Sequence, residues 1–359
     1  MQSEVKPNVA FLGVDIMCKV VAVILTYNRK DLLKCALDAV YSQTRPCDSV
    51  IVVDNASQDG TSQMLMESHY PGLIGYVLSN NIGASGGFNA GFRLAYQHGA
   101  DFVWMMDDDV IPDPDALQQL LEAENFLNDK KVDHSFLLST AFTENKDVTN
   151  TPVLSVLKNR IGYGNWPEMA MHGLIPVQRA TFVSILVHRS VLEQHGLPIA
   201  SMFIWGEDYE YTLRVSQTMP GFLVGKSRVQ HVRQRSGTLN IHNEENPVRI
   251  KFYRHHVRNR IFITRKYFSK IKLLQVVWGD LKTSCNLLCK AEFAKSKVIL
   301  QGVIESVGFN PRAETVSSPF ETLKVSVSLI GNRSEHNVSI ADVDSAVQPT
   351  NNYVQESYS

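Results

Sequence analysis

Three consecutive carboxylates, Asp107, Asp108 and Asp109, follow a hydrophobic stretch of the chain. Like charges so close together repel one another, so a fold seldom keeps such a run without a cation beside it. Side chains of a strand alternate between its two faces, which predicts that Asp107 and Asp109 point to one side and Asp108 to the other. Two carboxylates on one side suit a hard cation such as Mg²⁺ or Mn²⁺. For the triplet taken alone, the alternative is a charged turn before Pro112 that caps the following helix.

Two further polar segments have the composition of ligand-binding loops. Residues 81–87, Asn-Ile-Gly-Ala-Ser-Gly-Gly, are predicted to form a glycine-rich loop. Its backbone N–H groups can approach a sugar or phosphate closely. Residues 54–60, Asp-Asn-Ala-Ser-Gln-Asp-Gly, begin with Asp54 at the end of a predicted strand. Each signal is weak alone, since loops often contain glycine and the Asp54 segment also suits a turn and a helix cap.

A second acidic group lies farther along, in Trp205-Gly206-Glu207-Asp208. A carboxylate beside an aromatic residue and a glycine, where a loop meets a helix, can serve as a general base. The alternative is negative charge placed to interact favourably with the dipole of that helix. His231 ends a predicted strand, and a lone histidine is by itself more often structural than a ligand.

These residues need elements that bring them to one place. The hydrophobic pattern predicts strands at residues 20–26, 50–55, 74–80 and 102–106, and helices at 31–42, 60–68, 88–98 and 114–127. Four β-α units in succession predict an α/β fold with a mostly parallel central sheet and helices on both faces. Ligands of such sheets bind beyond the carboxyl ends of the strands. The polar segments 26–29, 54–57, 80–87 and 107–109 are therefore expected at one edge.

The rest of the chain has a weaker pattern. Strands are predicted at 180–188 and 221–231, a helix at 209–217, and a long loop at 158–173. In that loop Tyr163 and Trp166, like Trp205, have rings that suit either acceptor sugars or core packing.

The bulk composition is that of an ordinary globular protein. The chain has 359 residues, 44% of them hydrophobic, and a net charge of -1, so we expect no nucleic-acid partner. No stretch has the roughly 20 apolar residues of a membrane span, and the N-terminus is not a convincing signal peptide. Five cysteines without a zinc-like spacing indicate a reducing, cytoplasmic location. Translation from either Met1 or Met17 suits the first predicted strand, which needs nothing before Lys19.

Residues 249–297 are strongly basic, with thirteen Lys or Arg against Asp280 and Glu292. A cationic helix with an apolar face can lie on an anionic membrane surface. This suggests peripheral contact with the inner, cytoplasmic face of a membrane, and the alternative is a solvated helix that packs back on the domain. The polar tail from residue 311 is expected to be loosely ordered, with one strand at 324–330.

Two stretches carry a resemblance to a known family. Residues 21–29, Val-Ala-Val-Ile-Leu-Thr-Tyr-Asn-Arg, and 52–61, Val-Val-Asp-Asn-Ala-Ser-Gln-Asp-Gly-Thr, resemble the opening of the large inverting family-2 glycosyltransferases. The resemblance runs from about Lys19 to His231, and more weakly to Gly308. It implies the GT-A fold, a nucleotide-diphosphosugar-binding α/β sandwich. The expected organisation is an N-terminal extension (1–18), a GT-A domain (19–245), a basic helical region (246–310) and a polar, partly disordered tail (311–359).

The resemblance also implies roles for individual residues. Those expected to hold the nucleotide sugar are Thr26, Tyr27, Arg29 and Asp54 at the nucleobase and ribose, Asp108 at the ribose or sugar, and Gly86 in the glycine-rich loop. Asp107 and Asp109 match a motif that binds Mn²⁺ or Mg²⁺ at the diphosphate, and His231 matches a histidine that completes this metal site. Glu207-Asp208 matches an acidic pair whose second member is the catalytic base. Asp208 would take a proton from the acceptor hydroxyl in a single displacement that inverts the anomeric carbon.

The donor sugar is a narrower question. Residues 83–88, Gly-Ala-Ser-Gly-Gly-Phe, together with a full aspartate triplet are most similar, within the family, to bacterial galactofuranosyltransferases. Residues 253–260 also look like the arginine-asparagine stretch that often follows the catalytic domain. This resemblance implies UDP-galactofuranose as donor and a glycan or lipid-linked acceptor in bacterial cell-surface polysaccharide synthesis, such as cell wall or lipopolysaccharide. A rhamnosyltransferase using dTDP-rhamnose is the alternative.

Three other classes share parts of this pattern. A processive polysaccharide synthase would carry membrane spans and a Gln-x-x-Arg-Trp motif, which Gln234-Arg235-Ser236 does not match. A sugar nucleotidyltransferase would carry a glycine-rich basic loop after the first strand, where this chain has residues 26–31. A non-catalytic nucleotide-sugar-binding protein would lack a base, and the Glu207-Asp208 pair argues against it.

Overall fold

The computed structural model describes residues 18–164, 166–232 and 239–330. Residues 1–17, 165, 233–238 and 331–359 lie outside this description. The predictions for the N-terminal extension, for Gln234-Arg235-Ser236 and for most of the polar tail therefore stay predictions. No helix in the described ranges combines the length and the apolar character needed to cross a bilayer.

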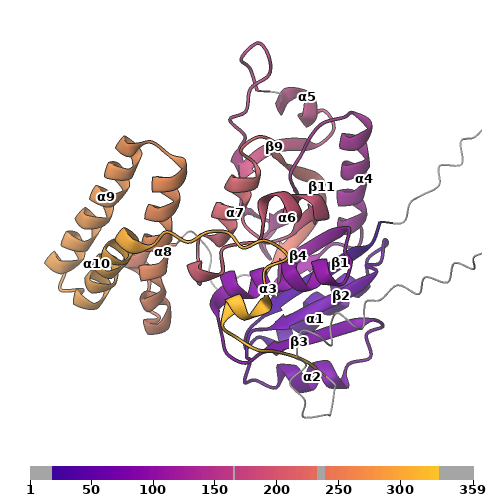
Figure 1. Cartoon of the computed structure of the whole chain (residues 1–359), viewed down its shortest axis with the longest axis horizontal. Helices are drawn as coiled ribbons and strands as arrows, with labels where there is room; N and C mark the ends of the chain where they lie inside the picture. Colours follow the sequence, from indigo (N-terminus) through magenta and orange to yellow (C-terminus); the bar gives the residue numbers. More distant parts are fainter. Residues whose placement is uncertain (1–17, 165, 233–238, 331–359) are drawn as a thin grey trace, which may run out of the picture.

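The first part of the chain folds into the four predicted β-α units (Figure 1). They comprise β1 (Val20–Thr26), α1 (Lys30–Tyr41), β2 (Ser49–Asp54), α2 (Thr61–Glu67), β3 (Leu73–Leu78), α3 (Gly83–Gln97), β4 (Phe102–Asp107) and α4 (Ala116–Asp129). Their strands pair in parallel in the order β3-β2-β1-β4. Every residue of β1 is buried, with Val23 packing on one face and Ile24 on the other. A parallel strand covered on both faces requires this continuous run of apolar residues.

The second part extends the same sheet in mixed directions. β10 (Ile185–His188) lies antiparallel to β4, and β6 (Leu137–Phe142), β11 (Gly221–His231) and β9 (Leu174–Arg179) follow. Shorter elements are β5 (Val110–Pro112), β7 (Val148–Thr149), β8 (Val153–Leu154), α5 (Trp166–Ala170), α6 (Arg189–His195) and α7 (Glu207–Val215). The α/β fold class with a mostly parallel central sheet is confirmed. The strand predicted at 180–188 is shorter, because Ala180 donates its N–H to the Thr212 hydroxyl rather than to a sheet neighbour.

Helices cover both faces of this sheet. Buried side chains of α3, α6 and α7 form one core with the strands. Those of α1, α2, α4 and α5 form the core on the other face. The sheet therefore presents only its strand ends to a ligand, as the sequence predicts.

Helix α3 begins at Gly83, five residues before the predicted start at residue 88. Most of the predicted glycine-rich loop is thus the first turn of a helix, which corrects that prediction. Gly83 has φ +77°, and a Cβ there would collide with the carbonyl oxygen of Phe203. A Cβ at Gly87 would collide with the Leu25 side chain. These glycines let α3 approach β1 and the segment before α7, so close packing accounts for them.

Three helices form a separate layer beside the sheet (Figure 1). We call α8 (Pro247–Tyr267), α9 (Lys270–Cys289) and α10 (Phe293–Gly308) the helical region. They share a core that includes Tyr253, Val257, Leu287 and Ile299. Several arginines of α8 are used internally: Arg258 donates to the carbonyls of Ser201 and Met202, and Arg265 to those of Ser306 and Phe309. Much of the basic character of α8 thus fastens the helices to one another and to the sheet domain.

Residues 311–330, here called the C-terminal strap, return from α10 to the sheet (Figure 1). Their side chains Val316, Phe320, Leu323 and Val325 belong to the core on the α3 face. Glu314 forms an ion pair with the fully buried Arg93 of α3, at 2.7 Å. β12 (Val327–Leu329) then lies antiparallel to β3 at the sheet edge. The strand predicted at 324–330 is present, but the strap is packed rather than loosely ordered, because its apolar side chains and Glu314 all have partners on the domain.

Candidate active site

The polar segments predicted at one edge do meet there. The parallel register places Thr26, the last residue of β1, opposite Asp54, the last residue of β2. Leu25 is opposite Asp107, the last residue of β4. The antiparallel pair β5–β11 adds His231, which is opposite Val110, and the Val232 N–H donates to the Asp109 carbonyl. Sheet register alone therefore brings Thr26, Asp54, the triplet and His231 to the same end of the sheet.

Arg29 lies between two members of the triplet. Its Nη1 is 3.0 Å from Asp108 Oδ1 and 2.7 Å from Asp109 Oδ2. The Thr26 hydroxyl donates to Asp108 Oδ2 at 2.7 Å. The prediction that Asp108 and Asp109 point to opposite sides is wrong, because β4 ends at Asp107 and the next two residues form a turn in which strand alternation no longer applies.

Burial perturbs the acidity of all three carboxyls. It raises the pKa of Asp107, and repulsion from Asp109 and Asp108 raises it further. It raises the pKa of Asp108 to about 6, although the Arg29 charge opposes the shift. Burial would also raise the pKa of Asp109, but His231 and Arg29 outweigh it and lower that pKa. Asp109 is therefore the member of the triplet most firmly held as a carboxylate.

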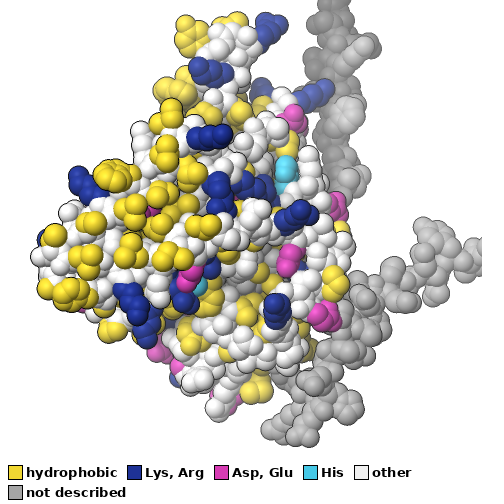
Figure 2. Space-filling model, turned by 60° about the vertical axis from the view of Figure 1, so that its left-hand side comes forward, with side chains coloured by type: hydrophobic (Ala, Val, Ile, Leu, Met, Phe, Trp, Pro, Cys, Tyr) yellow, Lys and Arg dark blue, Asp and Glu magenta, His cyan; other side chains and the backbone are white. Residues whose placement is uncertain are grey.

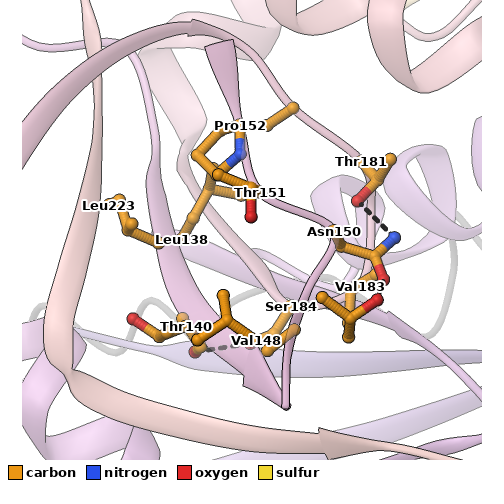
Figure 3. A pocket seen from close by; sticks show the side chains of 14 residues that line it. Leu138, Thr140, Val148, Asn150, Thr151, Pro152, Thr181, Val183, Ser184 and Leu223 are labelled. Atoms are coloured by element: carbon orange, nitrogen blue, oxygen red, sulfur yellow. Dashed lines mark hydrogen bonds between the residues drawn. The ribbon is translucent and has the colours of Figure 1, made fainter. Parts of the chain in front are cut away.

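The His231 ring faces Asp109 with one nitrogen and contacts Asn150 with the other. Its Nε2 is 3.3 Å from Asp109 Oδ1, and its Nδ1 is 2.9 Å from Asn150 Oδ1. Asn150 in turn donates to the Thr181 hydroxyl at 3.0 Å (Figure 3). If Nδ1 donates to Asn150, a neutral imidazole presents its Nε2 lone pair to a carboxylate oxygen. Such an arrangement calls for a positive charge between them, either a proton or a metal ion.

The two facing atoms have a spacing that suits a shared cation. Asp109 Oδ1 is buried and, within the described chain, accepts no hydrogen bond. Two ligands at about 2.1 Å from one octahedral ion lie about 3.0 Å apart, close to the 3.3 Å observed. Across the described residues, however, no group of three or more His, Cys, Asp or Glu side chains converges on one point. Asp109 and His231 therefore suit two ligand positions of one cation. Asp107 lies near them but does not supply a third ligand.

A small cavity adjoins Asn150 on the side of β6 (Figure 3). Its volume is about 30 Å³, and Leu138, Thr140, Thr151, Pro152 and Val183 are among its lining residues. This is room for one or two water molecules and far too little for a sugar ring. It is therefore not a donor site.

Three predicted donor-binding residues have different surroundings. Tyr27 is 44% exposed at the strand edge, so its ring is free to stack on a base. Asp54 is fully buried, and its carboxylate accepts from the Ser57 N–H and the Ser62 hydroxyl, which is the turn and helix-capping role given above as the alternative. Gly86 is buried within α3, where a Cβ would contact Ile82 at 2.6 Å. Close helix packing, rather than approach to a donor, accounts for Gly86.

Glu207 and Asp208 begin α7 after a strained turn. Phe203, Trp205 and Gly206 all have positive φ, at 68°, 62° and 127°. The Phe203 carbonyl accepts from the Ser85 N–H in the first turn of α3. Glu207 affects the pKa of Asp107 through its charge, so the acidic pair and the triplet belong to one electrostatic environment.

The members of this acidic pair differ in acidity. Burial, followed by the charge of Asp208, raises the pKa of Glu207 to about 8. Burial raises the pKa of Asp208 to about 6, an effect opposed by the Tyr209 N–H and the charge of Arg179. Near neutral pH Glu207 is therefore protonated while Asp208 is ionised. Only Asp208 can accept a proton.

The pH dependence of turnover follows from this order. If Asp208 is the base, kcat/KM should rise about tenfold per pH unit up to about pH 6 and then level off, since only the carboxylate can act. Rates between pH 4.5 and 9 check this, with binding of UDP and Mn²⁺ measured over the same range as a control for the triplet. A profile that is already flat at pH 5 would contradict the assignment.

The turn before Glu207 is held by a residue of the helical region. Asn259 of α8 is fully buried, and its Nδ2 lies within 3.1 Å of the carbonyls of Met202, Ile204 and Trp205. Trp205 itself packs at right angles to Phe252 and beside Tyr253 of α8, which favours core packing for its ring. Tyr163 and Trp166 remain exposed, at 72% and 53%.

Replacing Asn259 with Ala should therefore affect both stability and catalysis. Buried carbonyls left without a donor cost about 1–3 kcal/mol, which urea unfolding measures. We also expect kcat to fall more than KM changes, because the turn that aims Asp208 is loosened. Asn286→Ala on the exposed side of α9 is the matched control. Equal kcat in both variants would show that Asn259 is only structural.

Sequence reasoning missed Asn150, Arg179 and Asn259. Asn150 lies where hydrophobic periodicity is weak, and only its position in the fold relates it to His231. Arg179 ends β9, where its guanidinium lies 5.0 Å from the Tyr209 ring centre and its Nε has no hydrogen-bond acceptor among the described residues. Asn259 stands in the arginine-asparagine stretch, for which the resemblance implies no structural role.

Comparison with known proteins agrees with this geometry. Residues 21–166 match the model described as glycosyl transferase family 2. The galactofuranosyltransferase GlfT1 of Mycolicibacterium smegmatis is 28% identical over 209 residues, which cover 56% of this chain and 65% of that protein. GlfT1 of Mycobacterium tuberculosis strain H37Rv is 40% identical over 91 residues, or 25% of this chain and 30% of that protein. The chain thus spans less than two thirds of the length of these relatives.

Among solved structures, the chain is similar to S. aureus TarS residues 1–349 in complex with UDP-GlcNAc. Its TM-score is 0.47 at 17% sequence identity, and the match covers 72% of this chain and 70% of that one. The mixed α/β sheet and the edge formed by its strand ends agree with the family match, so the segment 21–166, rather than the whole chain, is assigned to glycosyl transferase family 2.

Proposed function

We propose that this protein is an inverting, metal-dependent glycosyltransferase that uses a nucleotide-sugar donor. The observation that carries the proposal is the pairing of charges at one sheet edge. A carboxylate that stays ionised, Asp208, begins α7 beside a protonated Glu207. The triplet ends β4 close enough for Glu207 to perturb Asp107. A proton acceptor next to a cation-binding edge is what transfer from a nucleotide diphosphate sugar requires.

In this mechanism Asp208 removes the proton from the acceptor hydroxyl as that oxygen attacks the anomeric carbon. Protonated Glu207 adds no second negative charge beside the base. Asp109 and His231 would hold Mn²⁺ or Mg²⁺, with Asp107 beside them. When bound, that ion supplies positive charge to the leaving diphosphate. Thr26 and Arg29 hold Asp108 and Asp109 in place, and Tyr27 offers a ring to the nucleobase.

The names of two relatives support a proposal for the donor sugar. Both are named galactofuranosyltransferases, and we propose UDP-galactofuranose as donor and a glycan or lipid-linked acceptor of bacterial cell-surface polysaccharide. Transfer of rhamnose from dTDP-rhamnose is the second candidate. All five cysteines are free, which supports action on the cytoplasmic side.

A donor screen tests the proposal. The chain is incubated with Mn²⁺ and a panel of nucleotide sugars, and release of the nucleotide is measured with and without an acceptor. We expect release from UDP-galactofuranose that disappears with EDTA and returns with added Mn²⁺. Turnover that persists in EDTA would refute metal dependence. No turnover with any donor or acceptor, together with retained nucleotide binding, would favour a non-catalytic binding protein.

A further inference from the structure

The outer sides of α9 and α10 expose large apolar side chains, six of them by 65% or more. Ile271, Leu274 and Trp278 on α9 are exposed by 70%, 70% and 71%, and Phe293, Ile304 and Val307 on α10 by 65%, 71% and 81%. We call these six residues the apolar face. We propose that the apolar face binds the surface of an anionic phospholipid bilayer, an inference that goes beyond the transfer reaction and does not depend on its donor.

The apolar face is distinct from the core of the helical region. Residues 271, 274 and 278 recur at helical spacing along one side of α9, as 293, 304 and 307 do on α10. The opposite sides of the same helices contribute Leu287, Val298 and Ile299 to the core shared with α8. Figure 2 shows hydrophobic side chains gathered on the side of the molecule that carries the helical region, with Lys and Arg side chains around them. Both helices are therefore apolar on two sides, and only one side is needed for folding.

The charges on these two helices select a negatively charged partner. Five lysines are exposed on α9, on α10 and between them, namely Lys270, Lys272, Lys282, Lys290 and Lys297. The three carboxylates of this segment all have basic partners: Asp280 pairs with Arg260, Glu292 with Lys295, and Glu305 lies 3.8 Å from Arg254. The surface around the apolar face is thus positively charged.

This combination favours a bilayer over a second protein chain. Lysine is depleted in the buried centres of protein–protein interfaces. Helices with a wide apolar side flanked by lysines are typical of the boundary between lipid headgroups and acyl chains. The arginines of α8 take little part, because Arg258 and Arg265 donate to backbone carbonyls within the protein. The interaction is therefore assigned to α9 and α10 rather than to the whole basic stretch 249–297.

Vesicle flotation tests the assignment with the full chain. We expect it to float with vesicles of phosphatidylglycerol and phosphatidylethanolamine, but not with phosphatidylcholine alone, and to bind less at 1 M salt. Leu274→Glu combined with Ile304→Glu should weaken binding at least tenfold. Lys282→Gln combined with Lys297→Gln should weaken it about 25-fold, since each basic residue near an anionic surface contributes about fivefold. Trp278 fluorescence should shift to shorter wavelength with anionic vesicles, and the shift should be absent from Trp278→Phe.

Met66→Glu is the matched control, because Met66 is 56% exposed on α2, in the sheet domain. It should bind vesicles like the unaltered chain. The proposal is overturned if the unaltered chain ignores anionic vesicles, or if Leu274→Glu with Ile304→Glu binds them normally. It is also overturned if that variant turns a dimer into a monomer while neither form binds lipid, since a second copy would then cover the apolar face. Release of nucleotide in solution should be unchanged in these variants, so this outcome is separate from that of the donor screen.

Discussion

Asp208→Asn is expected to reduce sugar transfer about 10³-fold while leaving nucleotide binding intact. General base catalysis contributes typically 10²- to 10⁴-fold, and an amide cannot accept the proton of the acceptor hydroxyl. The substitution changes little else, because Asp208 Oδ1 accepts from the Tyr209 N–H at 2.7 Å and an amide oxygen can do the same. Single-turnover rates and the affinity for UDP with Mn²⁺ give the two readouts.

Glu207→Gln serves as the comparison. Glu207 is protonated near neutral pH, so an amide resembles its working state and the loss of rate should be much smaller. The apparent pKa of Asp208 should stay at about 6, because Glu207 is already neutral over the pH range in which Asp208 titrates. If Asp208→Asn transferred sugar at the unaltered rate, another group would be the base. If neither variant changed any measured property, the reading of the chain as a binding protein would be favoured.

Asp109→Asn is expected to abolish the effect of Mn²⁺ on UDP binding and to reduce transfer at least 100-fold. Asp109 is the carboxylate that faces His231 Nε2, and it also pairs with Arg29 at 2.7 Å. An amide has no net charge to attract the cation and offers a weaker oxygen ligand. Titration with Mn²⁺, followed by the rise in melting temperature with UDP present, measures the loss without relying on activity.

Asp113→Asn is the matched control, because Asp113 has a half-exposed side chain and lies 4.0 Å from Arg228. It should respond to Mn²⁺ as the unaltered chain does. An ion-dependent shift of unchanged size in Asp109→Asn would remove Asp109 from the metal site. A shift lost equally in both variants would point to general loss of charge rather than to a specific ligand.

The sequence predicts the parallel half of the sheet well because the information there is local. β1 to β4 are short apolar runs, each followed by a helix with one apolar side, and parallel pairing then places Thr26, Asp54 and Asp107 at one edge. No long-range contact has to be known. The edge, and with it most of the candidate site, follows from the order of elements alone.

Other features depend on contacts between distant residues. From the sequence alone, Gly83 and Gly87 suggest a loop. In the structure they lie in a helix, where contact with Phe203 and Leu25 leaves no room for a side chain. Strand alternation ends at Asp108 because β4 stops at Asp107, and the turn that follows brings Asp108 and Asp109 to the same nitrogen of Arg29. Asn259 is 52 residues beyond Glu207 in sequence, and only the packing of α8 shows that it holds the turn before that residue.

The helical region is tied to the sheet domain at both of its ends, by Asn259 of α8 and by the C-terminal strap. The chain enters the helical region through α8, anchored at Asn259, and returns through Glu314 to β12, which pairs with β3 at the sheet edge. A segment tied at one end can swivel, whereas a segment tied at both ends keeps its orientation. With the apolar face seated on a bilayer, the sheet edge that carries Asp208 would then stand at one height above the lipid. An acceptor anchored in the same bilayer would then meet Asp208 at a fixed distance from the lipid.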